Sequence, residues 1–223
     1  MLLLPEPDKV EIAVDEAGRG CLAFEVCAAA VIMPSKLPSE DCVDILKNLE
    51  MIKDSKKLTA LRREKLATFI KEYAVAYGIA TASPQEIDEI NILNATYRAM
   101  HRAIDEVMTK VSGHADVLII DGDKFKPYHP APEFSDAFDG WMEHHCIPGG
   151  DNTRMNIAAA SILAKTHRDH LVKTYVEKHP EFAERYGFDT NKAYGTKKHM
   201  DGIKKYGVTS YHRKSFAPVR ECM

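Results

Sequence analysis

Residues 10–20 read Val-Glu-Ile-Ala-Val-Asp-Glu-Ala-Gly-Arg-Gly, and this stretch sets the expectation for the fold. Apolar and polar side chains alternate up to Val14, which is the pattern of a strand with one buried face. The strand then ends on two adjacent carboxylates, Asp15 and Glu16. These acids are either solvated at a strand-to-turn junction, or they hold a divalent cation, since hard ions such as Mg²⁺ prefer carboxylate oxygens.

The composition is that of an ordinary globular protein. The 223 residues are 45% hydrophobic and 28% charged, which fits one large domain or two small ones. The net charge of −3 does not by itself indicate a nucleic-acid partner. Five scattered cysteines form no C-x-x-C pair, which argues against a zinc ribbon and favours a reducing, cytoplasmic location. No apolar run approaches the roughly 20 residues of a membrane helix, so we expect no membrane partner.

The order of strands and helices predicts a mixed α/β sheet in a single domain. We expect a core to about residue 180 and a basic helical part over about 181–223. The segment 124–148 is rich in proline and aromatic residues, and we expect it to be mostly loop. The predicted strands cover residues 10–14, 25–33, 74–82 and 116–120. The predicted helices cover residues 39–49, 59–73, 83–111 (with a break near 91–94), 156–178 and 197–206.

Further acids fall where a sheet edge would bring them near Asp15. Asp121 ends the apolar strand 116–120, and ligands of such sheets bind at the carboxyl ends of strands. Asp151 follows two glycines, and it is either the N-cap of the next helix or an acid that reaches inward from a loop. Together with Glu16, these acids have the chemistry of a two-metal site for phosphodiester hydrolysis.

Basic side chains gather toward the C-terminal end. Lys165 and Arg168 lie within one turn of a predicted helix, where they would screen phosphates; for Arg168 an ion pair with Asp169 or with another acid is the alternative. Residues 191–220 hold eight lysines and arginines against one acid, with four interleaved aromatic residues. This pattern suits a phosphate backbone with stackable bases, although a solvated basic face has the same composition.

Five motifs occur in order along the chain, and together they resemble type 2 ribonuclease H, the ribonuclease HII family. The motifs are Asp-Glu-Ala-Gly-Arg-Gly (15–20), Asp-Ser-Lys-Lys-Leu (54–58), Gly-Asp (150–151) before Ile-Ala-Ala-Ala-Ser-Ile-Leu-Ala-Lys (157–165), Tyr-Gly-Thr-Lys-Lys-His (194–199) and Tyr-His-Arg-Lys-Ser-Phe-Ala-Pro-Val (211–219). The resemblance implies an RNase H-like mixed sheet flanked by helices, with a helical C-terminal extension. It also implies Mg²⁺- or Mn²⁺-dependent hydrolysis of RNA in RNA–DNA hybrids, with a role in RNA primer removal.

The resemblance further implies incision 5′ to a single ribonucleotide embedded in duplex DNA, which leaves a 3′-hydroxyl and a 5′-phosphate. By motif position, four acids are catalytic and bind metal: Asp15, Glu16, Asp121 and Asp151. The implied substrate contacts are Gly18, Arg19 and Gly20 on the ribose 2′-hydroxyl, Tyr194 on the neighbouring deoxyribose, Ser55 and Lys56 in a phosphate-contacting loop, and Lys165 and Arg168 in the motif helix. The 2′-hydroxyl is the group that distinguishes RNA from DNA.

The chain departs from the family pattern just after the Gly-Arg-Gly motif. Many bacterial members have Pro-Leu-Ala-Gly-Pro-Val there, whereas residues 21–26 read Cys-Leu-Ala-Phe-Glu-Val. Gly149 stands where lysine is common, and the spacing from Asp121 to Asp151 is longer than in compact members. These differences leave open the relative activity on hybrids and on single ribonucleotides.

Two other classes of protein fit parts of this sequence. A glycosyltransferase would use Asp121-Gly122-Asp123 to hold a metal and a nucleotide sugar, but the N-terminal region contains no nucleoside-binding motif. A non-catalytic nucleic-acid-binding module would use the basic C-terminal end, but it has no need of four acids at strand and loop ends. We therefore expect a monomeric enzyme whose partners are RNA–DNA hybrids and ribonucleotide-containing duplex DNA.

Overall fold

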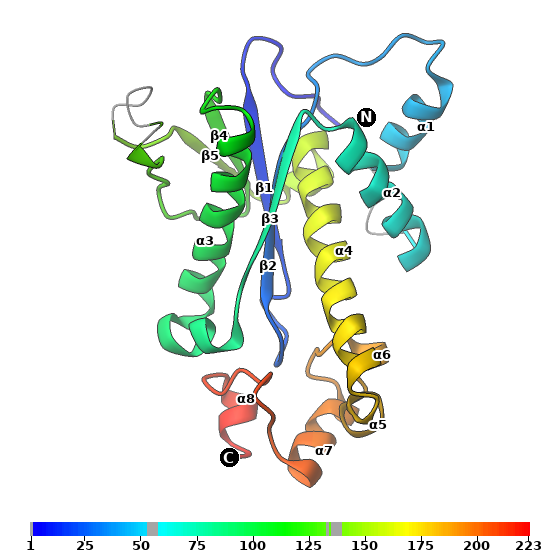
Figure 1. The fold of residues 1–223 in the computed structure, drawn as a ribbon, viewed down its shortest axis with the longest axis vertical. Helices are drawn as coiled ribbons and strands as arrows, with labels where there is room; N and C mark the ends of the chain where they lie inside the picture. Colours follow the sequence, from blue (N-terminus) through cyan, green and yellow to red (C-terminus); the bar gives the residue numbers. More distant parts are fainter. Residues whose placement is uncertain (1, 53–57, 133, 135–139) are drawn as a thin grey trace.

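The computed structural model, which describes residues 2–52, 58–132, 134 and 140–223, contains a five-stranded mixed sheet with the strand order β3-β2-β1-β4-β5 (Figure 1). Strand β1 pairs antiparallel with β2 and parallel with β4. Because parallel strands run in the same direction, the carboxyl-terminal parts of β1 and β4 lie at the same edge of the sheet. The strands are β1 (Glu11–Ala17), β2 (Val26–Ile32), β3 (Ala76–Ala82), β4 (Val117–Asp121) and β5 (His144–Ile147).

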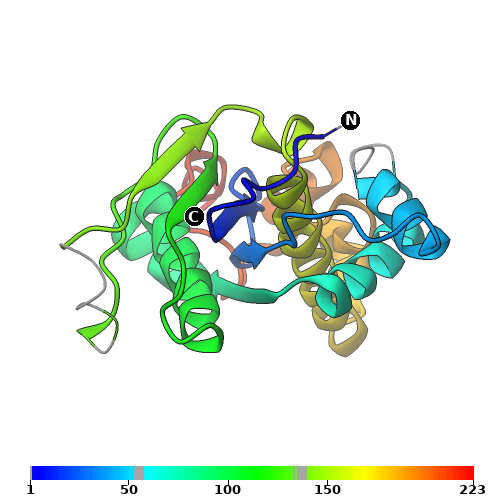
Figure 2. The ribbon, with the colours of Figure 1, turned by 90° about the horizontal axis from the view of Figure 1, so that it is seen from above.

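Long helices cover both faces of the sheet, as the view from above shows (Figure 2). Alternation along β1 decides which side chain meets which helix. Ile12 and Val14 belong to the core with helix α3 (Pro84–Lys110), whereas Ala13 belongs to the core with helix α4 (Met155–Lys178). On the α4 side, the outer helices are α1 (Val43–Ile52) and α2 (Ala60–Tyr73).

A helical C-terminal unit, residues 181–223, lies near the carboxyl end of β1, at the foot of the view in Figure 1. It has its own apolar core, to which Phe24 contributes from the segment between β1 and β2. Its helices are α5 (Glu181–Tyr186), α6 (Phe188–Asn191), α7 (Lys197–Tyr206) and α8 (Ala217–Arg220).

The expected mixed sheet with flanking helices is confirmed, and so is the break in α3, where Asn91 has φ 66° and ψ 164°. The expectation of loop over 124–148 is wrong at its end, because residues 144–147 form β5, which pairs parallel with β4. This strand lies at the edge of the sheet with no fully buried side chain, so no alternating pattern marks it in the sequence. Within the described ranges, no helix has both the length and the apolar character needed to cross a membrane.

Candidate active site

The site begins at the shared end of β1 and β4. Val14 pairs with Ile120, so the next residues along each strand, Asp15 and Asp121, are neighbours at this edge, and β1 continues past Asp15 to Ala17. Asp15 is buried with 5% of its surface exposed, and Glu16 follows at the margin of the same edge. Two strands that are distant in sequence therefore bring carboxylates to one place.

Asp151 reaches this edge on a short 3-10 helix, η3 (Gly150–Asn152), between β5 and α4. The N-cap residue of α4 is Arg154, so the alternative that Asp151 caps this helix is wrong. Gly150 packs closely here: a Cβ on it would overlap Ile157 and lie 3.3 Å from Oδ1 of Asp121. Glycine at this position thus lets the turn that carries Asp151 approach the carboxylate of Asp121.

Burial and mutual repulsion disfavour negative charge on these acids. Burial raises the pKa of Asp15 well above its usual range, and the charges of Glu16 and Asp121 raise it further, against a hydrogen bond with Ser161. Burial also raises the pKa of Glu16, although Arg19 opposes this effect. A cation among these groups would remove the electrostatic cost of ionising them.

Protein donors hold Asp15, Glu16 and Asp151 in their present orientations. The backbone N–H of Glu16 donates to Oδ1 of Asp15 at 2.7 Å, and Nη1 of Arg19 donates to Oε1 of Glu16 at 3.1 Å. Nδ2 of Asn152 donates to Oδ1 of Asp151 at 2.7 Å. Among the described residues, no three His, Cys, Asp or Glu side chains already converge as metal ligands. The all-oxygen donor set of the four acids fits a hard divalent cation.

The Gly-Arg-Gly turn follows the acids and rests on a buried arginine. Gly18 has φ +94°, and a Cβ there would overlap the side chain of Arg168, whereas Gly20 faces open space. Arg168 comes from α4 with 2% of its surface exposed, and it donates to the carbonyl oxygens of Lys192 at 3.0 Å and Ala23 at 3.4 Å. Its burial favours support of the turn over direct phosphate contact.

The suggested ion pair between Arg168 and Asp169 is not what the structure shows. Asp169 instead accepts from Nη2 of Arg63 at 3.3 Å, and Nζ of Lys165 lies 3.8 Å from the same oxygen. The Lys165 side chain remains 43% exposed, so its ammonium group stays accessible to a ligand.

A second buried arginine, Arg213, holds the same turn from the C-terminal unit. Its Nε donates to the carbonyl oxygen of Phe24 and its Nη1 donates to that of Arg19, both at 2.9 Å. Arg213 is fully buried, so counting it among the phosphate-facing basic residues of 191–220 was wrong. Burial lowers its pKa to about 10, at which it stays charged near neutral pH.

Comparison with known proteins matches residues 12–219 to the model of a family described as Ribonuclease HII. The chain belongs to the ribonuclease HII family. It is 46% identical to the ribonuclease HII of Christiangramia forsetii over 209 residues, which cover 93% of this chain and 91% of that protein.

Solved structures of lower identity share the fold. The ribonuclease H2 of Pyrococcus horikoshii superposes with a TM-score of 0.68 at 22% identity, covering 95% of this chain and 96% of that one. Bst-RNase HIII in complex with Mn²⁺ gives a TM-score of 0.64 at 16% identity, covering 96% of this chain and 69% of that one. The ribonuclease HII resemblance and the RNase H-like fold inferred from the motifs are therefore confirmed.

The remaining predicted substrate contacts fall at different places relative to this ribonuclease HII site. Tyr194 lies close to the Gly-Arg-Gly turn, because it forms an isolated antiparallel bridge with Cys21, and 44% of its surface is exposed. Its ring faces the guanidinium of Arg168 at 6.0 Å. Ser55 and Lys56 lie outside the described residues.

The departure from the family pattern at Phe24 is accommodated by the C-terminal unit. Phe24 has φ 65°, a conformation that favours the glycine of the common pattern. Its ring is fully buried and stacks on Tyr175 at 5.1 Å between centroids. The Tyr175 hydroxyl donates to Oε1 of Glu25 at 2.9 Å. The bulky side chains thus fill an aromatic core, while the backbone carbonyl of Phe24 accepts a hydrogen bond from Arg213.

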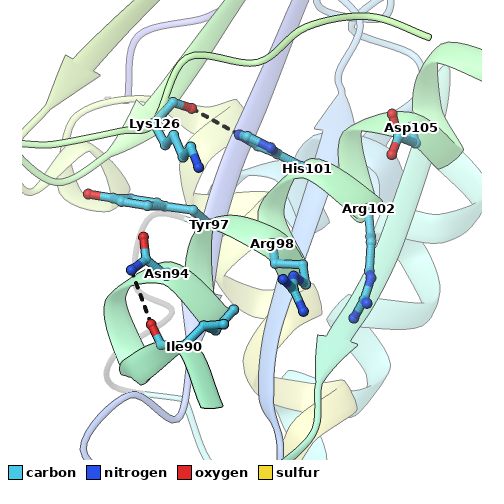
Figure 3. Close-up of a pocket in the computed structure, with 8 residues that line it drawn as sticks. All are labelled: Ile90, Asn94, Tyr97, Arg98, His101, Arg102, Asp105 and Lys126. Atoms are coloured by element: carbon cyan, nitrogen blue, oxygen red, sulfur yellow. Dashed lines mark hydrogen bonds between the residues drawn. The ribbon is translucent and has the colours of Figure 1, made fainter. Parts of the chain in front are cut away.

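A polar pocket of about 460 Å³ opens along α3 (Figure 3). Burial raises the pKa of Tyr97, which lines this pocket. The lining residues are Ile90, Asn94, Tyr97, Arg98, His101, Arg102, Asp105 and Lys126.

Proposed function

We propose that this chain hydrolyses the RNA strand of RNA–DNA hybrids and nicks duplex DNA 5′ to a single ribonucleotide, giving a 3′-hydroxyl and a 5′-phosphate. Membership of the ribonuclease HII family supplies the reaction class, a metal-dependent endonuclease. The observation that supports the finer statement is the juxtaposition of acids from β1, β4 and η3 with an anchored Gly-Arg-Gly turn.

In this proposal Asp15, Glu16, Asp121 and Asp151 hold Mg²⁺ or Mn²⁺. When bound, the cations activate a water molecule and stabilise the leaving oxygen of phosphodiester hydrolysis. The raised pKa of Asp15 supports this role, because a site that disfavours charge in the empty protein gains most from a cation. That Bst-RNase HIII, a protein of the same fold, was solved with Mn²⁺ supports a divalent metal.

On the substrate side of the site, some residues contact the substrate and others hold those residues in place. Gly18, Arg19 and Gly20 present backbone groups that read the ribose 2′-hydroxyl, and the exposed ring of Tyr194 stacks on the neighbouring sugar. Arg168 supports the turn from beneath, while the exposed ammonium of Lys165 is available to a phosphate. Ser55 and Lys56 are proposed phosphate contacts from the motif alone.

The nucleic-acid strand continues along the α3 pocket. Arg98 and Arg102 share the carboxylate of Glu86, at 3.1 and 2.7 Å, and so keep further N–H groups for another acceptor. Lys126, which is exposed, extends the positive charge of the pocket (Figure 3). Cations along such a groove favour a phosphate backbone.

One chain supplies every group assigned to the proposed site, which supports action as a monomer. The five free cysteines, which form no C-x-x-C pair, support a reducing, cytoplasmic setting.

The test is a labelled DNA duplex with one ribonucleotide, incubated with Mg²⁺, with Mn²⁺ or with EDTA. We expect a nick 5′ to the ribonucleotide in both metals and none in EDTA, with end mapping that gives a 3′-hydroxyl and a 5′-phosphate. A full RNA–DNA hybrid of the same sequence, run in parallel, measures the relative activity that the residues 21–26 leave open. Intact duplex in all three conditions would contradict the proposal.

A further inference from the structure

Two histidines, His199 on α7 and His212 between α7 and α8, form a buried pair in the C-terminal unit. Their Nε2 atoms lie 3.1 Å apart, and the exposed fractions of the two residues are 0% and 1%. At its two ends the pair contacts backbone groups, the carbonyl oxygen of Tyr194 and the N–H of Thr209. Neither histidine has a role in the hydrolysis proposed above.

The two backbone groups determine where the hydrogens lie. The Thr209 N–H can only donate, at 2.9 Å, so Nδ1 of His212 is an acceptor and its hydrogen is on Nε2; the Thr209 hydroxyl, also 2.9 Å from Nδ1, can donate to the same nitrogen. The Tyr194 carbonyl can only accept, at 3.0 Å, so Nδ1 of His199 carries the hydrogen and its Nε2 is an acceptor. Both ends therefore require the same direction of donation, from Thr209 through His212 and His199 to Tyr194.

This chain of hydrogen bonds requires both rings to be neutral. A second hydrogen on His212 would face the Thr209 N–H, and one on His199 would face the N–H of His212. Burial lowers the pKa of His199, and burial together with the neighbouring ring lowers the pKa of His212 to about 4.

Uncharged groups surround the pair. From α5, Tyr186 faces it with its ring, and from α6, Phe188 does the same, at 5.1 and 4.8 Å between centroids. Among the described residues, no carboxylate or cation contributes to either histidine pKa. The geometry therefore holds one pair of tautomers, and no nearby charge stabilises another.

We propose that His199 and His212 are positioning residues, which hold Tyr194 in place through its carbonyl group. The preceding backbone needs such support, because Lys192 and Ala193 have φ of 49° and 66°, a strained conformation for residues with a side chain. The same carbonyl also accepts from the Thr196 N–H at 2.7 Å. The expected effect on cutting rests on the proposed function, whereas the expected effect on the position of Tyr194 does not.

The first test reads the wild-type tautomers from ¹⁵N-labelled histidine side chains by NMR. At pH 7.5 we expect hydrogen on Nδ1 of His199 and on Nε2 of His212, with both rings still neutral at pH 5.5. The opposite tautomer in either ring, or protonation of either above pH 6, would overturn the proposal.

The second test compares His199→Leu, which removes the donor to Tyr194, with His199→Asn, whose Nδ2 takes the place of Nδ1. We expect backbone ¹⁵N relaxation to show a mobile Tyr194 in the leucine variant and a rigid one in the asparagine variant. Ile203→Ala is the matched control, because Ile203 is a buried residue of the same helix outside the hydrogen-bonded chain. Equal rigidity of Tyr194 in wild type and His199→Leu would overturn the proposal, whatever the activity of the protein.

The third test measures cutting of the single-ribonucleotide duplex. We expect His199→Leu to lower kcat/KM about tenfold to a hundredfold, since small misplacements of a contact residue have effects of this size, and His199→Asn to recover most of the loss. In a Tyr194→Ala background, His199→Leu should cause no further loss, whereas additive losses would show that His199 does not act through Tyr194. If wild-type protein does not cut while Tyr194 responds as expected, the proposed function fails and the positioning role stands.

Discussion

The acid cluster and the histidine pair are both buried sets of ionisable groups, and they deal with burial in opposite ways. Asp15 is 5% exposed and has a raised pKa, and the neighbouring charges of Glu16 and Asp121 add to the cost of ionising it. His212 is 1% exposed and has a lowered pKa, and neutral hydrogen bonds satisfy both of its nitrogens. In the acid cluster, burial makes ionisation unfavourable unless a cation compensates the charge. In the histidine pair, hydrogen bonds within the protein satisfy the buried neutral rings.

The largest expected effect comes from removing one charge of the acid cluster. Asp121→Asn keeps the size of the side chain but removes a metal-binding oxygen charge, so we expect cutting to fall about a thousandfold or more while duplex binding survives. The matched control is Asp116→Asn at the other end of the same strand, where the carboxylate accepts from the N–H of Val10. Full activity in Asp121→Asn, measured on the single-ribonucleotide duplex, would break the assignment of the cluster.

The contact between Gly18 and Arg168 predicts a difference between two glycines of one motif. A methyl group on Gly18 meets the Arg168 side chain and a positive φ, so we expect Gly18→Ala to lower the free energy of unfolding by about 3 kcal/mol. Gly20→Ala meets open space and should change stability by less than about 1 kcal/mol. Urea unfolding of both variants measures the difference, and equal stabilities would contradict the close packing of this turn.

The histidine pair predicts a loss of stability as pH falls. The folded pKa of His212 is about 4 and its ordinary value is 6.5, so in that window the unfolded chain takes up a proton that the folded chain does not. Stability is therefore full above pH 6.5 and declines toward pH 4, by on the order of 3 kcal/mol for this group. His212→Gln keeps a donor near Nε2 but does not titrate, so its unfolding profile should be flatter than that of wild type. The same pH dependence of stability in wild type and His212→Gln would show that the histidine pair does not cause the loss of stability.

Removing a charge from the acid cluster should also stabilise the metal-free protein. Asp121 raises the pKa of both Asp15 and Glu16, which reports its repulsion of their charges. In EDTA we expect Asp121→Asn to gain about 1 kcal/mol of stability, and in Mg²⁺ we expect it to lose most of the metal-dependent rise in Tm. Thermal unfolding with and without metal checks both, and a lower Tm in EDTA would argue against electrostatic repulsion at the cluster.

The smallest expected effect concerns the α3 pocket, where the positive charge belongs to lysine and arginine side chains and not to a metal ion. Lys126→Ala should weaken duplex binding a few-fold and reduce the salt dependence of log Kd by about one ion. Lys47→Ala, at an exposed position on α1, is the control. Binding by fluorescence anisotropy at several salt concentrations measures this, and the same slope for both variants would exclude Lys126 from the path of the strand.

The strands that carry the acids could be predicted from sequence because each has a strong local signal. Ile12 and Val14 alternate with smaller or polar residues, and Asp121 ends a continuous apolar run. The position of Asp151 could not be decided, because an acid after two glycines suits a helix cap and an inward turn equally well. The N-cap of α4 at Arg154 and the close approach of Gly150 to Asp121 distinguish them, and both depend on the folded chain.

The support of the site could not be predicted for a different reason. Arg213 resembles any other base of the C-terminal segment, and its burial depends on carbonyl oxygens of Arg19 and Phe24 that are nearly 200 residues away in the chain. His199 and His212 are separated by most of α7 and the segment that follows it, and no spacing rule pairs their rings. Such contacts arise from tertiary packing, which a single sequence does not display.

The anchoring of the Gly-Arg-Gly turn by Arg213 has a consequence for the order in which the protein becomes competent during synthesis. Arg213 follows all four acids and α4 in the chain. The growing polypeptide therefore contains the four acids of the proposed metal site before it contains the arginine that donates to the Gly-Arg-Gly turn. Under the proposed function, the acids are synthesised before the residue that anchors the turn proposed to recognise the substrate.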